Sequence, residues 1–121
     1  MPSRRKRTVT LIVGGARSGK SRYAQKLAQG FKRVVFIATA PKSDAEMRRK
    51  IARHQAERPA TWRTIEAPVD LERAIRSTGA EADLVIVDCL TLYVANLMRG
   101  VRRRQAILDR FHAVVEAVRA A

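Results

Sequence analysis

Residues 11–28, "LIVGGARSGKSRYAQKLA", contain the most informative pattern in this sequence. Gly14 is followed by four residues and then by Gly19-Lys20-Ser21, which fits the phosphate-binding pattern G-x-x-x-x-G-K-[ST]. Glycines permit positive φ angles and close approach of an anion, so backbone N–H groups can point inward around a phosphate. An apolar run precedes the pattern and a helix-like run follows it. The stretch therefore predicts a nucleotide-phosphate loop, a P-loop, between a strand at 8–13 and a helix at 21–29.

Each part of this loop has an expected role. The N-terminus of the helix adds a favourable partial charge for phosphate. Lys20 is expected to reach the β- and γ-phosphates, and the Ser21 hydroxyl is expected to bind Mg²⁺. An ordinary glycine-rich turn with an unrelated lysine is the alternative, which the order of strand, loop and helix disfavours. The residues expected to contact the nucleotide here are Gly14, Gly15, Ala16, Arg17, Ser18, Gly19, Lys20 and Ser21.

Composition limits the class of protein without naming a reaction. With 121 residues and 46% hydrophobic content, the chain can form one domain with a core. No apolar run approaches the length of a membrane span. The single cysteine, Cys89, excludes an internal disulfide and fits a reducing compartment. We therefore expect a cytoplasmic protein.

The formal net charge of +14 indicates an anionic partner, such as a nucleotide, a polyphosphate, a nucleic acid or an acidic membrane surface. Solvated, arginine-rich helix faces are the alternative explanation. The basic clusters lack the interleaved aromatic residues on which single-stranded nucleic acids stack. A nucleic-acid partner is therefore not favoured.

The chain is expected to divide into a disordered basic leader, residues 1–7, and a P-loop nucleotide-binding domain, residues 8–121. Apolar runs predict strands and helices that alternate along the domain. Such alternation favours a mostly parallel sheet covered on both faces, an α/β three-layer sandwich of the P-loop NTPase type. The strands are expected at 8–13, 33–38, 61–67 and 83–87, and the helices at 21–29, 44–57, 70–77 and 101–121.

Asp88 and His54 carry the remaining chemistry. Four apolar residues bring Asp88 to the end of a buried strand, where ligands of open α/β sheets bind, so it is expected to hold Mg²⁺ directly or through water. A helix cap is the alternative role for this aspartate. His54 lies in a basic field, which lowers its pKa and favours a neutral, nucleophilic imidazole. From the residues alone, His54 could also be an ordinary surface histidine, as His112 is expected to be.

Four segments, "GGARSGKS", "VVFIATA", "EMRRKIARHQAERPATWRTIEAP" and "LVIVDCLTLYVANL", resemble in this order a family of cobalamin biosynthesis. The family is the bifunctional adenosylcobinamide kinase and adenosylcobinamide-phosphate guanylyltransferase, and the resemblance covers residues 8–98. It implies that adenosylcobinamide is phosphorylated with ATP or GTP. It also implies that GMP is then transferred from GTP to adenosylcobinamide phosphate, through a covalent GMP-histidine, to give adenosylcobinamide-GDP. The matching histidine is His54.

The resemblance further implies a guanine-nucleotide site. Glu66 is a candidate for guanine N–H recognition, because a carboxylate can accept two such hydrogen bonds. A surface ion pair is the alternative for Arg58 and Glu66. The residues that the resemblance places in this site are Ala38, Thr39, Ala40, Arg58, Glu66 and Asp88.

Family members are homo-oligomers that continue with further strands, so this chain is expected to be the N-terminal part of the family domain. The sheet is then expected to be incomplete on its C-terminal side, and guanylyltransferase turnover to be severely reduced or absent. The tail helix is expected to carry an apolar stripe that needs a covering surface. Two other functions stay open, a P-loop nucleic-acid-binding ATPase fragment and a nucleotide-binding remnant without turnover. The stripe consists of Ile107, Phe111, Val114 and Val118.

Overall fold

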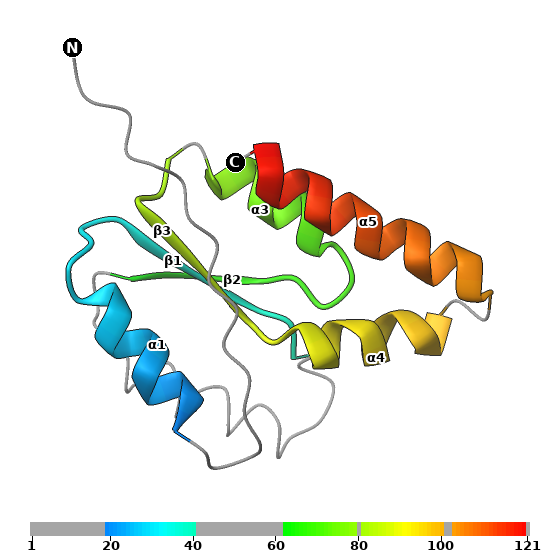
Figure 1. The fold of residues 1–121 in the computed structure, drawn as a ribbon, viewed down its shortest axis with the longest axis horizontal. Coiled ribbons are helices and arrows are strands. Elements are labelled where there is room, and N and C mark those ends of the chain that lie inside the picture. The colour runs from blue at the N-terminus through cyan, green and yellow to red at the C-terminus, as the bar shows by residue number, and fades with distance from the viewer. Residues whose placement is uncertain (1–18, 41–61, 80, 101–102, 121) are drawn as a thin grey trace.

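The structure of the chain is a computed structural model that describes residues 19–40, 62–79, 81–100 and 103–120. Strands and helices alternate along the first part, and two helices follow the last strand (Figure 1). The expected leader at 1–7, strand at 8–13 and helix at 44–57 lie outside the described residues. In chain order the elements are α1 (Lys20–Ala28), β1 (Val34–Ala38), β2 (Arg63–Glu66), α3 (Leu71–Gly79), β3 (Leu84–Asp88), α4 (Leu90–Gly100) and α5 (Arg104–Ala120).

The three described strands form one sheet in the order β2-β1-β3, and both strand pairs are parallel. The central strand β1 is buried at all five positions, as a strand covered on both faces must be. Figure 1 shows α3 and α5 on one side of the sheet and α1 on the other. The predicted α/β architecture with a parallel sheet is confirmed.

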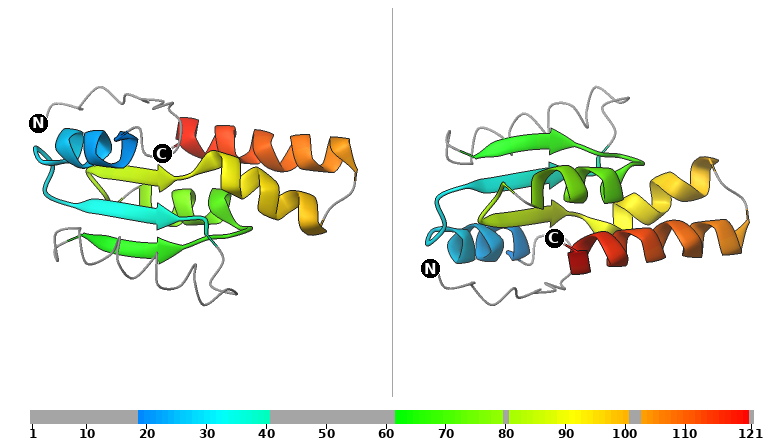
Figure 2. Two further views of the ribbon diagram at one scale, coloured as in Figure 1. Left: turned by 90° about the horizontal axis from the view of Figure 1, so that it is seen from below. Right: turned by 90° about the horizontal axis from the view of Figure 1, so that it is seen from above.

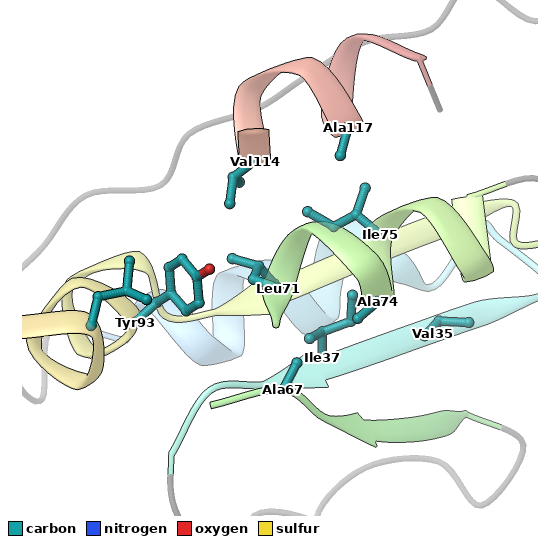
Figure 3. Close-up of a cluster of buried hydrophobic side chains, with 10 residues drawn as sticks. Val35, Ile37, Ala67, Leu71, Ala74, Ile75, Tyr93, Val114 and Ala117 are labelled. Atoms are coloured by element: carbon teal, nitrogen blue, oxygen red, sulfur yellow. The ribbon is translucent and has the colours of Figure 1, made fainter. Parts of the chain in front are cut away.

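The main core lies between the sheet and the pair α3 and α5 (Figure 3). Alternate strand residues such as Val35 and Ile37 point to this side, whereas Val34 and Phe36 are buried on the α1 side. The last helix, α5, packs against α3 through its buried Val114 and Ala117. Within the expected apolar stripe, Val114 is buried and Val118 packs against the core, whereas Ile107 and Phe111 are only half-buried. The described chain therefore covers the stripe only in part.

The helix α4 was not predicted from the sequence, which left residues 90–100 without an assigned element. It begins two residues after Asp88 and buries Tyr93, Asn96 and Leu97. Its spacing does contain a helical signal, because Leu90, Tyr93 and Leu97 recur at i, i+3 and i+7. The signal is obscured because an apolar strand runs almost directly into an apolar helix. Neither α4 nor any other helix in the described ranges is long and apolar enough to cross a membrane.

Candidate functional site

The sheet register places Glu66, Ala38 and Asp88 side by side at the last position of the three strands. Neighbouring residues in a parallel register point to the same face, here the face covered by α1 rather than the face packed on α3. The two acidic residues are separated by one strand, or about 10 Å. The structure therefore brings three of the predicted site residues into one row at the carboxyl edge of the sheet.

The first turn of α1 is directed toward this edge of the sheet. Figures 1 and 2 show α1 running roughly opposite to β1, so that its N-terminus points in the direction in which the strands end. Gly19 precedes α1 with a φ of 86°, in the left-handed region that favours glycine. Lys20 and Ser21 are the first two residues of α1, and only their backbone is described. The positive end of a helix thus faces the edge that carries the carboxylates.

Thr39 follows β1 and is completely buried. Its hydroxyl oxygen accepts a hydrogen bond from the Cys89 N–H at 2.9 Å and donates to the Cys89 carbonyl at 2.8 Å. The Thr39 N–H donates to the Asp88 carbonyl at 3.0 Å. Thr39 therefore continues the pairing of β1 with β3 beyond the end of the strands and fixes the peptide that follows Asp88.

Asn96 of α4 is a second buried polar residue at this edge, and the sequence analysis did not select it. Its side-chain nitrogen donates to the Thr39 carbonyl at 2.7 Å and to the Pro68 carbonyl at 3.0 Å. The side chain is 7% exposed. One amide thereby joins α4 to the segments that leave β1 and β2. An asparagine inside an apolar helical run is the signal that could have revealed it.

Asp88 is half-buried at the end of β3. Within the described parts of the chain, no side chain pairs with its carboxylate and no N–H group of α4 donates to it, so the helix-cap alternative gains no support. No cluster of three metal-binding side chains occurs in these ranges. A single carboxylate without a partner among the described side chains fits Mg²⁺, which is commonly held by one or two carboxylates together with phosphate oxygens and water.

The other predicted site residues lie apart from this network or beyond the description. Ala40 is half-buried next to Thr39, Glu66 is exposed at the end of β2, and Cys89 is half-buried. The rest of the predicted phosphate loop and the two predicted residues of the second reaction lie outside the described residues. They are Gly14, Gly15, Ala16, Arg17, Ser18, His54 and Arg58.

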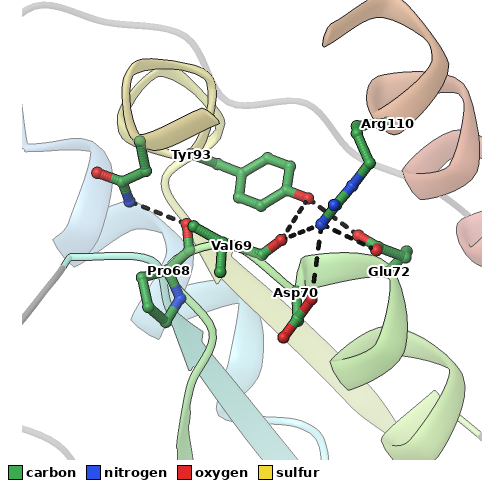
Figure 4. A network of polar contacts seen from close by, with 7 residues as sticks. Pro68, Val69, Asp70, Glu72, Tyr93 and Arg110 are labelled. Carbon is green, nitrogen blue, oxygen red and sulfur yellow. Dashed lines mark hydrogen bonds and ion pairs between the residues drawn. The ribbon is translucent and has the colours of Figure 1, made fainter. Parts of the chain in front are cut away.

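A second polar cluster, the helix junction, joins α3, α4 and α5 through Asp70, Glu72, Tyr93 and Arg110 (Figure 4). The Tyr93 hydroxyl donates to Glu72 at 2.9 Å, and Arg110 pairs with Glu72 at 3.2 Å and with Asp70 at 3.5 Å. Arg110 also donates to the Val69 carbonyl. Burial, followed by the hydrogen bond to Glu72, raises the pKa of Tyr93. The hydrogen bond with Tyr93 raises the pKa of Arg110.

The parallel sheet with helices on both faces defines an α/β protein, and the sequence pattern that ends at Gly19-Lys20-Ser21, at the start of α1, is that of the P-loop type. The family model "Cobinamide kinase / cobinamide phosphate guanyltransferase" matches residues 10–121. The chain therefore belongs to this family.

Relatives support the same assignment. A "bifunctional adenosylcobalamin biosynthesis protein CobP" of Pseudomonas aeruginosa is 52% identical over 89 residues, which are 73% of this chain and 51% of the relative. The proteins named CobU of Salmonella typhimurium and Escherichia coli are 42% and 40% identical over 88 residues, again 73% of this chain and 49% of each relative. The chain spans about half the length of the curated relatives it matches.

Proposed function

We propose that the chain is the nucleotide-binding part of an enzyme that phosphorylates adenosylcobinamide and then transfers GMP to the product. The donor is ATP or GTP in the first reaction and GTP in the second. The single observation that carries the proposal is the family match over residues 10–121, which include both the phosphate-loop pattern and His54. The names of the relatives, which are bifunctional proteins of adenosylcobalamin biosynthesis, agree with it.

The nucleotide is proposed to bind at the carboxyl edge, with its phosphates at the start of α1. Backbone N–H groups of the loop that ends at Gly19 hold the phosphates, and Lys20 neutralises charge on the β- and γ-phosphates. The row of Glu66, Ala38 and Asp88 lies on the α1 face of the same edge, which supports this placement. Glu66 is proposed to recognise guanine N–H groups, at the far side of the row from Asp88.

Mg²⁺, when bound, would offset the charge of the triphosphate and of the leaving group. Asp88 and Ser21 are proposed to hold it. The support is that Asp88 projects toward the side of the sheet on which α1 begins, and that no described side chain engages its carboxylate.

In the kinase reaction, the substrate hydroxyl attacks the γ-phosphorus of the donor and the bond to the β-phosphate breaks. In the second reaction, the neutral imidazole of His54 attacks the α-phosphorus of GTP, and pyrophosphate leaves. A phosphate oxygen of adenosylcobinamide phosphate then attacks the same phosphorus, so that the bond to His54 breaks and adenosylcobinamide-GDP forms. Lys20 stabilises the negative charge of the leaving group in both reactions.

Covalent labelling tests this mechanism directly. Incubation with GTP labelled at the α-phosphate and Mg²⁺ is expected to leave label on the protein in an acid-labile, base-stable bond, as a phosphoramidate requires. His54→Asn is expected to lose the label and to keep nucleotide binding. Label that tolerates acid, or that persists in His54→Asn, would contradict a histidine nucleophile at position 54.

His112 provides the matched control, because it is the second of the two histidines and is exposed on α5. His112→Asn is expected to retain full labelling. Equal loss of label from both variants would indicate a general effect of histidine removal rather than loss of the nucleophile.

A further inference from the structure

We propose that Thr39 and Asn96 are positioning residues, which fix the peptide after Asp88 and thereby hold its carboxylate in place for a divalent cation. We call these two residues the clasp. The inference rests on the proposed role of Asp88 in binding Mg²⁺. It assigns to Thr39 a function through the backbone of β3.

The contacts of Thr39 carry the first step. The Thr39 hydroxyl is fully buried, and it uses its single donor and one of its two acceptor sites on the backbone of Cys89, so its described contacts lie within the protein. The same residue binds the Asp88 carbonyl through its N–H. Both polar groups of the peptide between Asp88 and Cys89 are therefore held by Thr39, directly next to the side chain of Asp88.

Asn96 carries the second step, because its side chain binds the backbone of Thr39. Its side-chain N–H groups donate hydrogen bonds to the carbonyls of Thr39 and Pro68. These hydrogen bonds restrain the segments that follow β1 and β2 relative to α4. Since α4 begins at Leu90, the chain leaves β3 and returns to the same edge within eight residues. The backbone after Asp88 is thus bound by Thr39, and Thr39 is bound in turn by Asn96.

The site needs this restraint for a physical reason. Mg²⁺ demands near-ideal octahedral geometry, so the affinity of a site for Mg²⁺ falls steeply when one of its protein ligands is displaced. Asp88 has no side-chain partner in the described residues that could orient it before the cation binds. Fixing the backbone at the end of β3 lowers the number of positions that the carboxylate can occupy, and supplies the preorganisation that a single ligand lacks.

The test uses the isosteric change Thr39→Val, which removes the hydroxyl, and Thr39→Ser, which keeps it. The first readout is the Mg²⁺ midpoint for binding of a fluorescent GTP analogue to the full chain. The second is the rate at which a thiol reagent labels Cys89, the single cysteine, without nucleotide or metal. Thr39→Val is expected to raise both the midpoint and the labelling rate about fivefold, and Thr39→Ser is expected to recover most of the wild-type values.

Thr78→Val is the matched control for simple destabilisation. Thr78 is also buried, and its hydroxyl donates to the Ala74 carbonyl at 2.7 Å, but it lies on α3 outside the clasp. This variant is expected to lower stability while leaving both readouts of the folded protein unchanged. If Thr39→Val does not fold, Thr39→Ala and Asn96→Ala provide the same two measurements.

The outcomes separate the clasp from the proposed function. If Asp88→Asn raises the Mg²⁺ midpoint but Thr39→Val leaves it unchanged, the clasp inference is overturned and the role of Asp88 stands. If Asp88→Asn itself has no effect, the proposed metal role fails, and the functional half of the inference fails with it. Equal effects of Thr39→Val and Thr78→Val would also overturn the clasp.

Discussion

Asn96 and Tyr93 lie three residues apart on α4, and each anchors a different polar region. At the carboxyl edge, Asn96 and Thr39 bind only backbone groups, and the nearby carboxylate of Asp88 has no side-chain partner in the described residues. At the helix junction, Tyr93 and Arg110 bind the carboxylate of Glu72 from two sides. Neutral hydrogen bonds hold the first region and leave its charge available, whereas the second region satisfies its charge internally.

This difference indicates how the two regions contribute to the protein. The carboxylate of Glu72, bound by Arg110 and Tyr93, joins three helices, and its hydrogen-bonding capacity is used within the protein. The half-buried carboxylate of Asp88 has no partner among the described side chains, so its charge remains available to a ligand. We therefore expect the helix junction to contribute mainly to stability and the carboxyl edge to contribute mainly to ligand binding.

The largest effect is expected at the anchor of the helix junction. Tyr93 is completely buried, so Tyr93→Ala leaves a cavity and is expected to lower the free energy of unfolding by about 4 kcal/mol. Tyr93→Phe keeps the ring and removes one hydrogen bond, with an expected loss of about 1 kcal/mol. Urea denaturation of both variants measures the two terms. A similar loss in both would mean that the hydroxyl, rather than packing, dominates.

A smaller effect is expected when each carboxylate is neutralised in turn. Glu72→Gln weakens the contacts with Arg110 and Tyr93 and is expected to cost about 1.5 kcal/mol of stability, with nucleotide binding unchanged. Asp88→Asn is expected to leave stability nearly unchanged and to weaken Mg²⁺-dependent binding of GTP. Denaturation and titration of both proteins check this contrast, and a destabilised Asp88→Asn would break it.

The smallest effect is a pH dependence of the helix junction. The pKa of Tyr93 in the folded protein is raised above its ordinary value of 10.0, so the folded state holds the phenol proton more tightly than the unfolded state. This contribution to stability is fully present below pH 10.0 and is lost as the pH rises through the folded pKa. Urea denaturation from pH 8 to pH 11 is expected to show a steeper decline for the wild type than for Tyr93→Phe. Parallel curves would contradict it.

Local patterns predicted most of the described elements to within two or three residues. The strand expected at 33–38 is β1, the strand at 83–87 is β3, and the tail helix is α5. These succeed because β-branched runs and helical spacing are local features. The helix α4 was missed because its apolar residues continue those of β3 with only Asp88 and Cys89 between them.

The candidate site shows the same division. Asp88 was selected because an apolar strand ends at it, and Gly19 because the loop pattern requires a glycine there. Asn96 could not be selected with equal reason, since its partners are carbonyl groups 57 and 28 residues away along the chain. Nothing in the local sequence states that those carbonyls would lie next to α4.

The phosphate-loop pattern, the alternation of strands and helices and the family can all be recognised from the amino-acid sequence, because each depends on residue types at short, fixed spacings. The folded arrangement is needed to see that Glu66, Ala38 and Asp88 share one row, that Thr39 binds the backbone after Asp88, and that Arg110 pairs with Glu72. Those outcomes depend on strand order, register and helix packing, which bring distant polar groups within hydrogen-bond range, where burial makes each unpaired group costly.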